Sequence, residues 1–262
     1  MTLVVTADDL GLSPGVTQGI LEAHRRGVVR SASLIVTFAG AEEAAALARV
    51  ERDLEVGLHI DLVGGGPISD PASVPSLCDD DGRFHPLPEL VRRLATGRVR
   101  ARDLATEVRA QAALARRWGV PAVAWDSHRH VHLMPPVARV VGRVARDEGV
   151  RWIRRGTSPR WSGLKGAAIH FGSLGSALAY RGIPGNAWYV DLTASRRRID
   201  ATALALLPAY GRLGEVGTHP GYPDDELRRL DPLVAERAVD LTLLTDPLVR
   251  AVLDGAVRWR VV

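Results

Sequence analysis

The acidic pair Asp8–Asp9 follows directly after a short apolar run near the start of the chain. One carboxylate is a common ligand of a divalent metal ion, and a second beside it can take a proton from water as a general base. Two Asp residues at the end of a strand can equally cap a helix or form a turn. The pair therefore indicates hydrolytic metal chemistry only if other ligand side chains come close to it.

Histidines follow three further apolar runs. They are His59, the run His128-x-His130-x-His132, and His219. Alternate residues of an extended segment point the same way, so we expect the run to gather imidazoles on one face. A histidine at a strand end is often a hydrogen-bonded structural residue, and that alternative stays open for the run as well.

One carboxylate and two imidazoles together form a three-ligand site with room for water and substrate, as in catalytic rather than structural metal centres. By ligand type this set suits zinc, cobalt, nickel or iron better than magnesium. We therefore expect one divalent metal ion, with zinc favoured and magnesium, cobalt and nickel left open.

The elements that must position these residues alternate between strand and helix. We expect strands over Leu3–Ala7, Ser33–Thr37, Leu54–Leu62, Ala122–Trp125, Val150–Ile153, Ala187–Leu192, Glu215–Thr218 and Ala256–Val261. We expect helices over Gly15–Arg26, Ala41–Arg49, Ala101–Trp118, Val137–Glu148, Ala201–Leu207 and Pro232–Leu244. The alternation requires a parallel sheet, and the acids and histidines then lie at the strand ends where parallel folds build their sites.

The 262 residues fit one α/β domain spanning residues 1–262, and periodicity leaves a barrel or an open sheet undecided. The segment Gly64–Pro88 is rich in Gly, Pro, Ser and Asp, and is too long for a simple connection. We expect it to form a functional loop or lid. No element is assigned to Gly156–Pro184.

The charge balance argues against nucleic acid as a partner. There are 34 Lys and Arg residues against 30 Asp and Glu, a net charge of +4. Aromatic residues do not interleave with the basic clusters, as a base-stacking surface would require. We expect these clusters to be solvated faces or local substrate contacts: Arg92–Arg93, Arg154–Arg155 and Arg196–Arg198.

Composition indicates a folded protein, since 46% of residues are hydrophobic and 24% are charged. No apolar run reaches the roughly 18 residues of a membrane span. Met1–Asp9 lacks the basic start and long apolar centre of a signal peptide. The single Cys78 cannot form a disulfide within the chain, which agrees with a reducing compartment. We therefore expect a cytoplasmic protein.

Four separated phrases, in this order, resemble the motifs of the YdjC-like (ChbG/HpnK) carbohydrate deacetylases. They are Thr6–Ser13, Val56–His59, Asp126–His132 and Val216–Gly221. The resemblance extends from residue 3 to about residue 225. It implies a distorted (β/α) TIM-like barrel with seven to eight parallel strands. It also implies an enzyme that removes acetyl groups from N-acetylated amino sugars.

By position, the resemblance assigns the metal ligands to Asp9, His59 and His128. It makes Asp8 the base that activates water, and His219 the group that stabilises the intermediate or protonates the leaving nitrogen.

Further residues are assigned to contact substrate or to support the metal ligands: His130, His132, Asp126, Glu107 and Gln111. The last two lie one helical turn apart, and a solvated helix face is the alternative for them.

The chain departs from the family pattern at two places. Leu10 stands where the family usually has Phe, and Arg129 stands where many members have His or Gln. We expect Arg129 to point away from the metal and to influence substrate choice.

The sequence thus predicts a metal-dependent hydrolase that cleaves the N-acetyl amide of an amino-sugar-containing substrate and releases acetate. Two alternatives stay open. The same site could cleave another amide or a phosphoester, or a catalytically silent barrel could serve as a binding protein. A silent barrel has no need of Asp8 beside Asp9. A homodimer is left open as the assembly.

Overall fold

The computed structural model describes residues 3–156, 175–193, 207, 212–253 and 255–261. Within them, parallel strands follow one another in the order β5-β4-β3-β2-β1-β7-β6, and β8 pairs with the amino end of β1. The strands are β1 (Leu3–Leu10), β2 (Ser31–Leu34), β3 (Glu55–Ile60), β4 (Ala124–Ser127), β5 (Trp152–Ile153), β6 (Trp188–Asp191), β7 (Gly214–Thr218) and β8 (Val257–Arg258).

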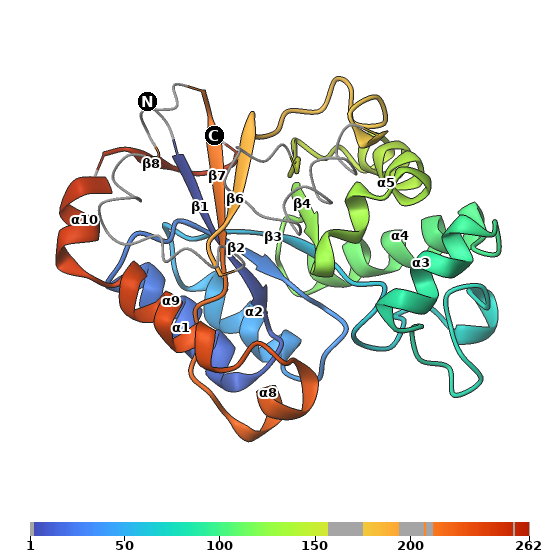
Figure 1. Ribbon diagram of the computed structural model, residues 1–262, viewed down its shortest axis with the longest axis horizontal. Coiled ribbons are helices and arrows are strands. Elements are labelled where there is room, and N and C mark those ends of the chain that lie inside the picture. The colour runs from blue at the N-terminus through green and yellow to red at the C-terminus, as the bar shows by residue number, and fades with distance from the viewer. Residues whose placement is uncertain (1–2, 157–174, 194–206, 208–211, 254, 262) are drawn as a thin grey trace.

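Helices cover the outside of this curled sheet (Figure 1). In that view α1, α2 and α9 lie beside the strands at one end of the molecule, and α3, α4 and α5 lie at the other. The α-helices are α1 (Pro14–Arg25), α2 (Ala41–Arg49), α3 (Leu87–Ala95), α4 (Ala101–Arg117), α5 (Pro135–Asp147), α8 (Asp225–Leu230), α9 (Ala235–Leu244) and α10 (Pro247–Leu253). The segments Pro71–Ser73 and His128–Leu133 form short 3-10 helices.

Helix α1 shows how local sequence fixes the connection after β1. Ser13 is its N-cap, and the Ser13 hydroxyl accepts a hydrogen bond from the backbone N–H of Val16. Pro14 occupies the first helical position, where its fixed φ and missing N–H carry no penalty. The helix then buries Ile20 and Ala23 in the apolar layer between sheet and helices.

The inside of the curled sheet carries a group of buried polar and charged side chains, beside a small apolar cluster of Val4, Ala124 and Trp152. Thr6 of β1 donates a hydrogen bond to Glu215 of β7, at 2.8 Å. Two arginines, Arg154 and Arg260, are buried among the strands and pair with carboxylates there. Buried charges of this kind are stable only when they are paired, so the interior forms one connected ionic network.

The predicted α/β fold with parallel strands is confirmed, with one correction to its shape. The sheet is a half-barrel, because no ladder joins its two edge strands, β5 and β6, in the described residues. The loop expected over Gly64–Pro88 ends in the first residues of α3, a helix that the sequence analysis did not predict. The expected helix Ala201–Leu207 lies outside the described residues, apart from Leu207.

None of the helices in the described part of the chain is long and apolar enough to span a membrane.

Candidate active site

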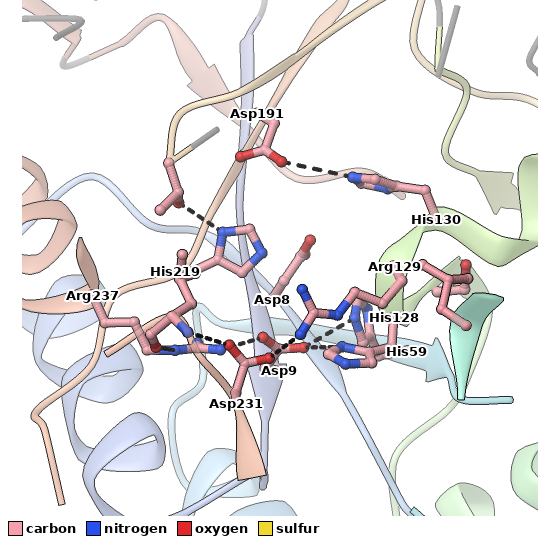
Figure 2. Close-up of a pocket in the computed structure, with 14 residues that line it drawn as sticks. Asp8, Asp9, His59, His128, Arg129, His130, Asp191, His219, Asp231 and Arg237 are labelled. Carbon is pink, nitrogen blue, oxygen red and sulfur yellow. Dashed lines mark hydrogen bonds and ion pairs between the residues drawn. The ribbon is translucent and has the colours of Figure 1, made fainter. Parts of the chain in front are cut away.

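A cavity opens at the carboxyl edge of the half-barrel. Its lining includes all five residues predicted as metal ligands or catalytic groups (Figure 2): Asp8, Asp9, His59, His128 and His219. These residues come from β1, β3, the end of β4 and the end of β7, which are separated in sequence but belong to one continuous part of the sheet, β4-β3-β2-β1-β7. The parallel topology alone brings them to one edge, as expected.

Both members of the acidic pair face the cavity because β1 is irregular at this point. The pairing of β1 with β2 shifts register between Ala7 and Leu10, and Asp9 has a φ of 67°. Neighbouring residues of a regular strand point to opposite faces of a sheet. The left-handed turn at Asp9 removes this alternation, at the conformational cost that functional sites often carry.

Asp9, His59 and His128 form a compact cluster. Asp9 Oδ1 lies 3.2 Å from His59 Nε2 and 3.0 Å from His128 Nδ1, and the three ligand atoms lie within 4.8 Å of one another. The three side chains are buried. A carboxylate and two imidazoles in this arrangement fit a divalent cation with open positions for water and substrate.

The charges around this cluster also favour a cation. Burial lowers the pKa of His59, but the Asp126 carboxylate and the hydrogen bonds that the ring donates to Asp126 and Asp9 raise it to about 10 overall. Burial raises the pKa of Asp9, but the Arg237 guanidinium and His128 hold it well below its ordinary value. The site therefore favours positive charge between Asp9 and the imidazoles, which is what a divalent cation provides.

A second group of possible ligands is less suited to a metal. Asp8, His59 and Asp126 also offer atoms within 4.8 Å of one another. The Arg154 guanidinium already bridges the two carboxylates, with Nη2 at 2.7 Å from Asp8 Oδ1 and 2.9 Å from Asp126 Oδ2. The positive guanidinium group of Arg154 therefore already occupies the place between these carboxylates that a metal ion would take.

Asp8 is held on both oxygens by Arg154, since Nη1 lies 2.6 Å from Oδ2 and Nη2 lies 2.7 Å from Oδ1. The Nε of Arg154 donates to Glu215, at 2.9 Å. We expect Arg154 to lie on a solvated face or to contact substrate, but this side chain is completely buried and does not line the cavity. Its place directly after a strand was the signal that could have identified it.

The prediction of solvated faces or substrate contacts was also made for two other basic clusters. Arg92 is exposed on α3, where it pairs with Glu89. The cluster Arg196–Arg198 lies outside the described residues.

The His-rich run is not extended, contrary to expectation. It forms a 3-10 helix, in which Arg129 and His130 both have a φ of 55°. The three imidazoles therefore separate, with His128 at Asp9 and His130 3.8 Å from Asp191 across the cavity. His132 turns into the protein interior.

His132 is a buried, hydrogen-bonded structural histidine, the alternative left open for the His-rich run. Its Nδ1 lies 2.5 Å from the Ser127 hydroxyl, and its Nε2 lies 3.0 Å from the backbone carbonyl of Arg154. Burial lowers the pKa of His132 to about 3, so the ring is neutral. It does not line the cavity, and it supports the backbone of the arginine that holds Asp8.

Glu107 and Gln111 are buried, so the solvated helix face considered for them was wrong. The Glu107 carboxylate accepts hydrogen bonds from the backbone N–H groups of Ile68 and Ser69, at 2.9 and 3.0 Å. Gln111 bonds both the N–H and the carbonyl of Asp61. The two side chains do not line the cavity but anchor the segment that follows β3.

Arg129 lines the cavity, whereas we expected it to point away from the metal site. Its guanidinium pairs with Asp231 at 2.7 Å, and Figure 2 shows this pair beside the Asp9 cluster. The Arg129 side chain keeps 38% of its surface exposed, so it contributes charge and hydrogen-bond donors to the cavity rim.

Arg237 was missed by the sequence analysis. It is buried in α9, and its Nη2 lies 2.7 Å from Oδ2 of Asp9, the oxygen that does not face the imidazoles. Arg237 lies on the same side of α9 as the buried Leu241 and Leu244. A charged residue on the apolar face of a helix was the signal that could have identified it.

Comparisons with known proteins show which family the chain resembles. The profile of the family described as YdjC-like protein matches residues 2–255. A carbohydrate deacetylase from Brevibacillus brevis is 34% identical over 247 residues, covering 94% of this chain and 91% of the relative. A chitooligosaccharide deacetylase from Serratia marcescens is 36% identical over 149 residues, covering 56% of this chain and 57% of the relative.

One solved structure has the same fold. The crystal structure of a candidate cellobiose-phosphate cleavage protein from Enterococcus faecalis superimposes with a TM-score of 0.82. It covers 97% of this chain and 94% of that protein at 24% sequence identity.

Proposed function

The chain belongs to the YdjC-like protein family, and we propose that it is a metal-dependent carbohydrate N-deacetylase. The substrate is an N-acetylated amino sugar, as part of an oligosaccharide or a glycoconjugate, and the products are a free amine and acetate. Relatives named carbohydrate deacetylase and chitooligosaccharide deacetylase support this choice of substrate class.

The proposal rests on a division of roles between two adjacent carboxylates. Asp9 shares the cluster with His59 and His128, whereas Asp8 is held apart from it by Arg154. A hydrolase needs such a division, because one carboxylate must stay bound to the metal while the other exchanges a proton with water. A binding protein needs no such second carboxylate.

Asp9, His59 and His128 would hold the metal ion, with zinc favoured by ligand type. When bound, a divalent metal supplies Lewis acidity toward the acetyl carbonyl and lowers the pKa of water at the site. Arg237 and Asp126 keep Asp9 and His59 in place for this task, each through a hydrogen bond of 2.7 Å.

Asp8 takes the proton from the attacking water, and its oxygens stay oriented because Arg154 holds both of them. The tetrahedral intermediate then collapses as the C–N bond breaks. Amide nitrogen is a poor leaving group unless it gains a proton, and His219 donates that proton from across the cavity. The chain therefore provides a base on β1 and an acid after β7.

Arg129 and His130 contact the sugar portion of the substrate, because both line the cavity beyond the metal cluster. The Arg129–Asp231 pair offers donors and acceptors that suit sugar hydroxyl groups.

The proposal is tested by incubating the purified protein with a panel of N-acetylated chito-oligosaccharides and with phosphorylated disaccharides, measuring acetate and phosphate separately. Acetate release from the acetylated sugars, with metal content measured on the same sample, is the expected result. Phosphate release alone would favour the phosphoesterase alternative. The absence of both products, in protein that carries metal, would favour a binding protein.

A further inference from the structure

His219 is joined to a buried carboxylate through the hydroxyl group of Thr193. Thr193 Oγ1 lies 2.8 Å from His219 Nδ1 and 2.6 Å from Asp240 Oδ2. Thr193 follows β6, and Asp240 lies on α9 with 5% of its surface exposed. The backbone N–H of His219 donates to the same oxygen of Asp240, at 2.8 Å.

The donors and acceptors along these contacts determine which ring nitrogen of His219 carries the hydrogen. A threonine hydroxyl has one hydrogen to donate, and a carboxylate oxygen that already receives a backbone N–H acts as an acceptor. Thr193 therefore donates to Asp240. Its lone pairs then face His219 Nδ1, so that nitrogen must carry the hydrogen. The neutral ring is the Nδ1–H tautomer, with its lone pair on Nε2.

Nε2 of His219 is free to meet a substrate. It has no hydrogen-bond partner among the residues that the structure describes, and the side chain lines the cavity. In Figure 2, Nδ1 carries the dashed contact, and the other ring nitrogen lies on the side of the ring toward Asp8.

We propose that Thr193 and Asp240 are positioning residues that hold His219 in the Nδ1–H tautomer and direct Nε2 toward the reacting amide. This extends the proposed function, in which His219 protonates the leaving nitrogen. Neither residue touches the reacting atoms.

The hydrogen-bonded chain from His219 through Thr193 to Asp240, called the relay below, suits both the protonated and the neutral form of a proton-donating imidazole. In the acid form both ring nitrogens carry hydrogen, and the Asp240 carboxylate stabilises the positive ring through the hydroxyl. When the C–N bond breaks, the Nε2 proton moves to the departing nitrogen and the ring keeps its Nδ1 proton. The neutral ring left behind is the tautomer that Thr193 binds, so no reorientation is needed.

Asp240 also has a structural role that must be separated from this one. Its bond to the His219 backbone orders the loop after β7 whether or not the hydroxyl is present. Thr193→Val removes only the hydroxyl and leaves that bond in place, whereas Thr193→Ser keeps the hydroxyl. These two variants form the matched pair for the test, and Thr193→Ala serves if the valine disturbs folding.

The first measurement is the tautomer, read from the ¹⁵N shifts of the His219 ring in substrate-free protein. The spectrum is recorded at a pH where the ring shifts no longer change, and the signal is identified by its loss in His219→Gln. We expect the Nδ1–H tautomer in the wild type and in Thr193→Ser, and a mixture in Thr193→Val. An Nε2–H tautomer in the wild type, or no change in Thr193→Val, would overturn the proposal.

The second measurement is acetate release by the same proteins. We expect Thr193→Val to lower kcat by about 10- to 100-fold with little change in KM or metal content, an effect of the size seen when a metal-binding imidazole loses its hydrogen-bond partner. Thr193→Ser should restore most of the rate. A wild-type kcat in Thr193→Val would overturn the positioning role. Failure of the wild type to release acetate would reject the proposed function, while the tautomer result would still decide the relay.

Discussion

Asp126 lies directly behind His59, with its Oδ1 2.7 Å from Nδ1 of the ring whose Nε2 is 3.2 Å from Asp9. When the ring gives up its Nε2 proton to bind a metal ion, a carboxylate in this position would keep the other proton on Nδ1 and the Nε2 lone pair toward the cluster. Asp126 is itself fixed by Arg154 at 2.9 Å and by Arg260 at 3.2 Å. The orientation of one predicted metal ligand thus depends on an arginine near the end of the chain.

Substituting Asp126 should weaken metal binding without removing a ligand. Asp126→Asn is expected to lower the metal affinity by about 10- to 100-fold, because the amide cannot hold the His59 proton as strongly. Competition with a coloured chelator measures this affinity. Asp81→Asn, in an exposed loop, is the control and should bind metal as the wild type does. Equal affinities in the two variants would refute a supporting role for Asp126.

Substituting Asp8 should separate chemistry from metal binding. Asp8→Asn is expected to keep its metal and to lower kcat by about 10²- to 10⁴-fold, the size of a general-base effect. The fold should survive, because Arg154 remains paired with Asp126 and Glu215. Loss of metal from Asp8→Asn, with retention in Asp9→Asn, would show that the roles of the two carboxylates are exchanged.

Much of the fold could be predicted from sequence because strand and helix alternate clearly. The expected helix Ala41–Arg49 has the bounds that the structure gives to α2. Strand ends were less accurate, as the expected Leu3–Ala7 became Leu3–Leu10. Closure of the sheet was not predictable, because a barrel and a half-barrel share the same periodicity and differ only in contacts between distant edges.

Some residues of the candidate site could also be predicted from sequence, and others could not. Asp9, His59 and His128 could be brought together from sequence, since each follows or ends a strand of a parallel sheet. The direction of His132 could not, because it depends on two consecutive left-handed residues in the preceding turn. Arg237 reaches Asp9 from a helix 228 residues along the chain, so its place on the apolar face of α9 could mark it as unusual but could not identify Asp9 as its partner.

Helix α1 and the loop that carries His219 are in close backbone contact at Gly19. A Cβ added to Gly19 would lie 2.5 Å from the Cα of Gly221, a distance that requires the backbone to move. Gly19→Ala is therefore expected to lower the free energy of unfolding by about 1–3 kcal/mol, as overpacking does. Urea denaturation measures this change. Gly66→Ala, where a Cβ meets nothing within 4 Å, is the control, and equal stability of both variants would show that the loop yields without strain.

The single cysteine reports on the segment between β3 and α3. Burial, followed by the negative charges of Glu107, Asp79 and Asp103, raises the pKa of Cys78 to about 11. The thiol therefore stays protonated at neutral pH, and its reaction rate with a disulfide reagent should still increase with each pH step up to pH 10. In denaturant the rate should level off near pH 9, as for a free cysteine. A similar plateau in the folded protein would show that this segment leaves Cys78 open to solvent.

We propose that Asp9, His59 and His128 bind the metal on which deacetylation depends. This proposal is tested most directly by measuring acetate release and bound metal together, in wild type and His128→Ala, during removal of metal by a chelator and its return as zinc. We expect wild-type acetate release to fall and recover in step with bound metal, while His128→Ala shows neither metal nor acetate. Undiminished acetate release from metal-free wild type would contradict it, and full metal occupancy in His128→Ala would show that this histidine is not a ligand.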